Sequence, residues 1–167
     1  SIEKDPQDVV RDAFAEAMKR DPDQVRQWVV LIDGDRKLQR WAKRAANELG
    51  VTVRFGRDMI HALQYLWKAG MAYHGEGTSE LEGWVLDRLE RVLEGKVSDV
   101  VAGMTRSATL NKLTQAQRRA IDRCARYFLR RKKMMSYAEL LSICAPVATG
   151  VVEGGCDMSQ NARGGGD

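Results

Sequence analysis

Apolar residues follow a strand pattern in one short part of the chain and a helical pattern elsewhere. Residues 28–32 are all apolar, three of them are β-branched, and the run ends at Asp33-Gly34-Asp35. A short apolar run that stops at such a turn is typical of a buried strand leading into a helix. A second strand is predicted over residues 51–55. The stretch between the two predicts a helix that ends at Gly50, with an apolar face made by Leu38, Trp41, Ala45 and Leu49.

Helical spacing governs the rest of the chain. A first helix is predicted to begin at the Asp5-Pro6 cap and to end before Asp21-Pro22. Past residue 58 every predicted element is a helix, and three of them open with a capping-box motif: Ser79-x-x-Glu82, Thr114-x-x-Gln117 and Ser136-x-x-Glu139. The sequence therefore predicts the α/β class, with a strand-helix-strand unit followed by a large all-helical block. The chain should be mostly helical overall.

Composition narrows the class of protein. The chain has 167 residues, of which 44% are hydrophobic, enough for one domain with a sizeable core. Its apolar runs are far shorter than a membrane-spanning segment, so we expect no membrane partner and a cytoplasmic location. The three cysteines include no C-x-x-C pair, which argues against a zinc clip.

Positive charge gathers in one predicted helix. The net charge of +4 and the isoelectric point of about 9.1 favour a polyanionic partner only weakly. Spacings of four, three and four residues place Arg119, Arg123, Arg126 and Arg130 on one helix face. Such a face can neutralise several DNA phosphates in a salt-dependent manner. The alternative is an ordinary solvated helix surface.

Asp33 is the first candidate for chemistry, because it ends the predicted strand at Trp28–Ile32. Ligands and metals collect at the carboxyl ends of strands in open α/β sheets. Three chemistries fit: a two-metal nuclease or transposase, a phosphotransferase with paired aspartates at Asp33 and Asp35, and a PIN-like ribonuclease. In a fourth interpretation Asp33 only opens a turn and Asp35 caps the next helix.

Asp58 and His61 form a second candidate site after the second strand. A histidine beside a helix-capping aspartate is more often a hydrogen-bonded structural group than a ligand. Its expected position, at the same sheet edge as Asp33, favours a supporting functional role. Zinc is not expected there, because the sequence has no thiolate or second imidazole at ligand spacing.

Four motifs occur in a fixed order along the chain: Leu31-Ile32-Asp33-Gly34, Asp58-x-x-His61-x-x-x-Tyr65-Leu66-Trp67, Cys124-Ala125-Arg126-Tyr127 and Thr149-Gly150-Val151-Val152-Glu153-Gly154-x-Cys156. Together they resemble the insertion-sequence transposases of the Kra type, bacterial relatives of the Mutator-like DDE transposases. The resemblance runs from about Ser1 to Cys156. Several separated motifs in order are more specific than any one of them.

The resemblance implies a partial RNase H-like core interrupted by an all-helical insertion. Residues 1–57 would belong to the core, 58–145 to the insertion, 146–156 to the start of the helix with the catalytic glutamate, and 157–167 to a disordered tail. Asp33 matches the second metal-binding carboxylate of the family and Glu153 the third, so both would bind Mg²⁺ or Mn²⁺. The first carboxylate has no counterpart, because no strand ending in Asp precedes Trp28.

The sequence past Cys156 departs from the family, where a basic, His-containing continuation of the catalytic helix is expected. A single-nucleotide frameshift would explain the change, so we expect a transposase truncated at both ends and inactive as an isolated chain. The resemblance implies that the partner is DNA, both the transposon ends and the target. It also leaves open that the intact transposase is a homo-oligomer. The alternative functions are a noncatalytic DNA-binding helical remnant and a PIN-like or paired-aspartate enzyme built on Asp33 and Asp35.

Overall fold

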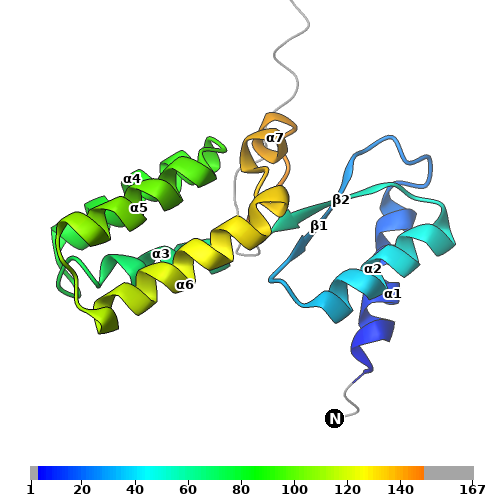
Figure 1. Cartoon of the computed structure of the whole chain (residues 1–167). Helices are drawn as coiled ribbons and strands as arrows, with labels where there is room; N and C mark the ends of the chain where they lie inside the picture. The colour runs from blue at the N-terminus through cyan, green and yellow to red at the C-terminus, as the bar shows by residue number, and fades with distance from the viewer. Residues whose placement is uncertain (1–3, 149–167) are drawn as a thin grey trace, which may run out of the picture.

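The computed structural model describes residues 4–148, in the order helix, strand, helix, strand and then helices (Figure 1). Most of these residues are helical, and the sheet that they form has two strands. The mixed α/β class and the mostly helical content predicted from the sequence are therefore confirmed. Within the described part of the chain, no helix is both long enough and apolar enough to cross a membrane.

The first unit consists of α1 (Pro6–Arg20), β1 (Trp28–Ile32), α2 (Arg36–Leu49) and β2 (Val53–Arg57). The two strands are parallel, and their register pairs Trp28 with Val53 and Ile32 with Arg57. Helix α2 is the crossover that parallel strands require. Helix α1 packs against α2. Their shared core contains Val10, Phe14, Ala42, Ala45, Ala46 and Val51.

Two details of this unit differ from the sequence prediction. Strand β2 begins at Val53, two residues later than predicted, because Val51 takes part in the hydrogen bonds that close α2. Gly50 is left-handed (φ 66°), and the Val51 N–H donates to the Ala46 carbonyl at 3.0 Å. The buried face of α2 is centred on its small residues, Ala42, Ala45 and Ala46. Leu49 was expected on this face, but it is 38% exposed.

The helical block follows directly. It contains α3 (Met59–Gly70), α4 (Ser79–Leu93), α5 (Val97–Leu110), α6 (Gln115–Arg131), the 3₁₀ turn η1 (Lys132–Met134) and α7 (Tyr137–Ser142). Helix α6 packs against both α3 and α5, and α3 also contacts α4. In Figure 1 these four long helices lie on one side of the sheet, and α1 and α2 lie on the other. A second hydrophobic core fills the block, with Leu66, Leu81, Met104, Phe128 and Tyr137 among its buried side chains.

Hydrogen bonds at the helix starts test the three predicted capping boxes. At α7 the prediction is wrong: Ser136 is the N-cap, but its side chain makes no capping hydrogen bond and its hydroxyl donates to the Lys133 carbonyl at 3.3 Å. At α6 the capping box is confirmed: Thr114 Oγ1 accepts from the Gln117 N–H at 3.3 Å, and Gln117 Oε1 accepts from the Thr114 N–H at 3.0 Å. At α4 the predicted cap is wrong by one residue. Thr78 is the N-cap, and its hydroxyl accepts from the Leu81 N–H at 3.3 Å, so Ser79 is already helical.

The chain leaves the sheet and comes back to the same edge. Helix α3 starts directly after β2, and the Met59 N–H donates to the Val147 carbonyl at 2.8 Å. Residues 59–146 are therefore an excursion that begins and closes beside the carboxyl end of β2. Residues 149–167 lie outside the described part of the chain, and with them Glu153 and the segments predicted beyond it.

Candidate nucleic-acid interface and the Asp33 turn

Asp33 is exposed at the carboxyl end of β1, where it shapes the turn into α2. One of its carboxylate oxygens, Oδ1, accepts from the Asp35 N–H at 3.0 Å. Asp35 is the N-cap of α2, and its Oδ1 accepts from the Lys37 N–H at 2.7 Å. The turn-and-cap interpretation of the two aspartates thus describes their hydrogen bonds. The second carboxylate oxygen of Asp33 has no part in these bonds.

Arg57 is a buried cation beneath this turn, and the sequence analysis did not single it out. It ends β2, and it is only 3% exposed. Gly34 has φ of +113°, and a Cβ atom added to it would overlap the guanidinium of Arg57. Position 34 therefore favours glycine for two reasons: its φ is positive, and Arg57 approaches too closely to leave room for a side chain. One sequence feature could have pointed to Arg57: it is a charged residue at the end of a strand, directly before the helix-capping Asp58.

Aromatic side chains hold the Arg57 guanidinium. Its Nε donates to the Tyr127 hydroxyl at 3.0 Å, and its Cζ lies 5.2 Å from the Tyr127 ring centroid. The Tyr127 ring stacks on Tyr65 with centroids 3.9 Å apart. Burial raises the pKa of the Tyr127 phenol, and the hydrogen bond from Arg57 opposes that shift. Arg57 Nη1 and the Tyr137 hydroxyl are both buried, and neither has a hydrogen-bond partner among residues 4–148. This cluster connects the end of the sheet to α3, α6 and α7.

Asp58 and His61 occupy the start of α3. The β1–β2 register pairs Ile32 with Arg57, so Asp33 and Asp58 follow paired residues at one sheet edge. The Asp58 N–H donates to the Ile32 carbonyl at 3.2 Å, and Asp58 Oδ1 accepts from the Ile60 N–H at 3.0 Å. Asp58 is 6% exposed, whereas His61 is partly buried. Asp58 therefore caps a helix at the same edge as Asp33, and the supporting role of His61 stays a prediction.

The carboxylates of the described residues do not make up a two-metal centre. No group of three His, Cys, Asp or Glu side chains within residues 4–148 is arranged to hold a metal ion. Two Mg²⁺ ions about 4 Å apart need a bridging carboxylate and further oxygen ligands. Asp33 offers one exposed carboxylate, and Glu153, the other predicted ligand, lies outside the described residues.

The predicted arginine face lies on the solvent side of α6. Ile121, Cys124, Ala125 and Phe128 form the buried side of this helix. Arg119, Arg123, Arg126 and Arg130 are all exposed, and no ion pair within residues 4–148 involves them. The helix carries six arginines and one carboxylate, that of Asp122. We call these four exposed residues the α6 arginine face.

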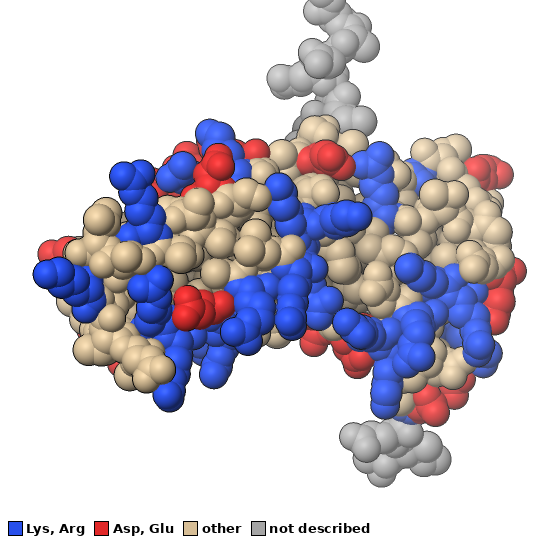
Figure 2. All heavy atoms as spheres, in the orientation of Figure 1, with Lys and Arg blue, Asp and Glu red and all other residues tan. Residues whose placement is uncertain are grey.

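A second basic helix lies near the first. Helix α2 carries five basic residues and a single acidic one, Glu48. All five are exposed: Arg36, Lys37, Arg40, Lys43 and Arg44. Figure 2 shows Lys and Arg side chains gathered in a band that runs from the region of α6 to the region of α2. Positive charge on this face therefore extends over both parts of the fold.

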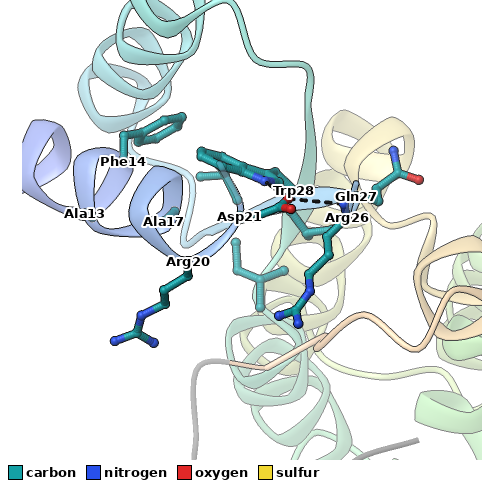
Figure 3. Close-up of a pocket in the computed structure, with 11 residues that line it drawn as sticks. Ala13, Phe14, Ala17, Arg20, Asp21, Arg26, Gln27 and Trp28 are labelled. Atoms are coloured by element: carbon teal, nitrogen blue, oxygen red, sulfur yellow. Dashed lines mark hydrogen bonds between the residues drawn. The ribbon is translucent and has the colours of Figure 1, made fainter. Parts of the chain in front are cut away.

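A further hollow lies elsewhere and contains none of the predicted site residues. It has a volume of about 480 Å³ and lies between α1 and β1, where Phe14 and Trp28 line it (Figure 3). Their ring centroids are 6.1 Å apart. Beside them Asp21 accepts hydrogen bonds from Trp28 Nε1 at 2.9 Å and from the N–H groups of Val25 and Arg26 at 3.0 and 3.1 Å. These contacts fix the loop between α1 and β1.

Comparison of the chain with protein-family models, with curated proteins and with solved structures finds no match.

Proposed function

We propose that this chain is part of a DDE-type transposase and that it binds duplex DNA along the phosphate backbone through the α6 arginine face. One observation carries the binding proposal. Four guanidinium groups share the exposed face of a rigid helix, and no described carboxylate pairs with them. Guanidinium groups bind phosphate oxygens with two parallel hydrogen bonds, and these contacts do not depend on base sequence.

The transposase part of the proposal is supported by motif order and by the path of the chain. The helical block starts after Arg57-Asp58 and closes at Val147, beside the point where it began. An insertion into an RNase H-like core has to leave and re-enter the core in this way. In that arrangement Asp33 would supply one carboxylate to Mg²⁺ or Mn²⁺ and Glu153, six residues past Val147, would supply another.

DNA binding by this face should follow counterion release. Each phosphate that is neutralised contributes about 0.9 to the slope of log K against log salt concentration. Four contacts would therefore give a slope of about −3.6. Non-specific affinities of this kind lie at about 10⁻⁴ to 10⁻⁶ M in physiological salt, so we expect weak and salt-sensitive binding.

Fluorescence anisotropy with a labelled 20-base-pair duplex tests the proposal across a salt series. Replacing Arg119, Arg123, Arg126 and Arg130 by glutamine should weaken binding more than tenfold at about 0.1 M salt and remove most of the slope. The matched control removes four exposed charges from four other helices: Lys19, Lys68, Arg91 and Arg106, each replaced by glutamine. This control should keep most of the affinity.

Two results would overturn the proposal. One is unchanged DNA binding after the four α6 arginines are replaced. The other is equal loss in the scattered control, which would mean that net charge, and not the α6 arginine face, attracts the duplex. Tighter binding of an RNA duplex of the same sequence would reassign the partner, because A-form RNA presents a different groove and phosphate geometry.

A further inference from the structure

A second basic feature adjoins the α6 arginine face and joins the two parts of the fold. A surface hollow of about 470 Å³ is lined by Arg36, Gln39 and Arg40 from α2 and by Arg131 from α6. Arg36 is the first residue of α2, and Arg40 follows one turn later on the same side of the helix. Arg131 is the last residue of α6, directly after Arg130 of the arginine face.

The chemistry of this lining is one-sided. Its polar groups are three guanidinium groups and one amide, with no carboxylate among the lining residues. Within residues 4–148, none of the three arginines takes part in an ion pair. Like charges that converge on one space repel each other, and a bound anion relieves this repulsion.

A phosphodiester is the anion that this arrangement fits. Guanidinium groups match the oxygens of a phosphate in a bidentate geometry, and the Gln39 amide supplies a neutral donor. The hollow also continues the α6 arginine face at its Arg130 end. A DNA strand that lies along α6 would reach the hollow next, and the band of basic side chains in Figure 2 runs in the same direction.

We propose that Arg36, Arg40 and Arg131 bind a backbone phosphate of the DNA that lies along α6. This inference rests on the proposed function and names the path of the DNA, from the helical block onto α2. Arg36 is only three residues past Asp33, and α2 starts directly after the Asp33 turn. The hollow is therefore a positioning site that brings the DNA backbone toward the carboxyl edge of the sheet.

The test removes the α2 half of the hollow. The double variant Arg36→Gln/Arg40→Gln should bind the 20-base-pair duplex about three- to tenfold more weakly at ~0.1 M salt, with a slope reduced by about 1, the contribution of one phosphate. The control is Lys37→Gln/Lys43→Gln, which removes two exposed charges from the same helix but none from the lining. It should keep the slope of the unmodified chain. Thermal unfolding of both variants checks that α2 remains folded.

The results separate this inference from the proposed function. Unchanged DNA binding by Arg36→Gln/Arg40→Gln, together with lost binding by the α6 variant, overturns the proposal that the hollow binds a phosphate. The α6 proposal is then still supported. Equal loss of DNA affinity in the two α2 variants also overturns the phosphate site in the hollow, because the overall positive charge of α2 would then explain the binding. Loss of binding in the Arg36→Gln/Arg40→Gln variant with no loss in the α6 variant overturns the α6 arginine face and, with it, the proposed path of the DNA along α6. No binding by the unmodified chain overturns both.

Discussion

Single residues at the ends of β1 and β2 decide how the candidate site is built. Arg57 is charged and buried, a combination that normally needs a partner for every donor. Its guanidinium is held by the Tyr127 hydroxyl and ring and by the space that Gly34 leaves open. The Asp33 turn therefore rests on a cation whose position depends on a residue 70 positions away in the chain.

Gly34→Ala tests this support. We expect a loss of about 1–3 kcal/mol in the free energy of unfolding, because the new methyl group would displace Arg57 and the backbone has φ of +113°. The control is Gly50→Ala, where φ is also positive but no atom lies within 4 Å of the added Cβ. Urea unfolding should give a clearly smaller loss for the control, and equal losses would mean that Arg57 moves aside without cost.

Asp21 predicts a dependence of stability on pH. Its pKa is lowered in the folded chain, mainly by the hydrogen bond from the Trp28 indole and further by two backbone N–H groups. A lowered pKa means that the carboxylate stabilises the fold above its unfolded pKa of about 3.9, and that this stabilisation is lost as the pH falls through the lower folded value. Asp21→Asn should therefore be less stable than the unmodified chain at pH 7, with a difference that shrinks below pH ~4.

Thermal unfolding at several pH values measures this difference. Asp23→Asn is the matched control, because Asp23 is an exposed residue of the same loop. A difference between Asp21→Asn and the unmodified chain that stays constant from pH 7 to pH 3 would show that the charge of Asp21 does not matter to the fold.

At the scale of elements, α6 has two separate tasks on its two faces. Its apolar face buries Ile121, Cys124 and Phe128 between neighbouring helices, and its other face presents arginines to solvent. Burial raises the pKa of the Cys124 thiol to about 12, so this cysteine is a packing residue and not a reactive one. The arginines depend on the apolar face, because packing keeps the helix formed and their spacing fixed.

Thr114→Ala tests whether the start of α6 is set by its capping box. The change removes the acceptor of the Gln117 N–H and should cost about 0.5–2 kcal/mol in the free energy of unfolding. Thr114→Ser keeps a hydroxyl at the cap and should cost much less. Chemical denaturation of both variants measures the difference. Equal stability of the two would show that packing alone holds the first turn.

At the scale of the whole molecule, two hydrophobic cores are joined at the sheet edge. One core belongs to α1, α2 and the strands, and the other to the helical block. The Met59–Val147 hydrogen bond closes the helical excursion where it started. Basic side chains of α6 and α2 form a band across both parts (Figure 2). The DNA surface that we propose is thus a property of the assembled fold and of no single element.

This arrangement predicts DNA binding without DNA cleavage. Under the proposed function, supercoiled plasmid incubated with the purified chain and Mg²⁺ or Mn²⁺ should stay intact, because a two-metal centre needs more carboxylate ligands than Asp33 and Glu153, the two that the proposal assigns. Gel electrophoresis of the plasmid measures nicking, with Asp33→Ala as the control. Metal-dependent nicking that disappears in Asp33→Ala would show that a complete catalytic site exists after all.

Local sequence determined the elements of this protein. The apolar run at residues 28–32, the Asp35, Asp58 and Thr114 caps and the left-handed Gly50 act over a few residues, so their effects could be predicted from neighbouring positions. The same holds for the exposed arginines of α6, because 3.6-residue periodicity fixes which side chains share a face. Where local signals competed, as at Thr78 and Ser79 or at Val51, the prediction was wrong by one or two residues.

Only the tertiary structure decided which distant residues meet. The contacts of Arg57 with Gly34 and Tyr127, and the convergence of Arg36, Arg40 and Arg131 on one hollow, join positions separated by 23 to 95 residues. No periodicity within one element encodes such contacts, because they depend on how α2, α3 and α6 pack around the sheet. Burial of Arg57 likewise follows from its neighbours in space, since the same residue at an open strand end would be solvated. The sequence by itself therefore determined the arginine face, and the fold decided which other cations lie beside it.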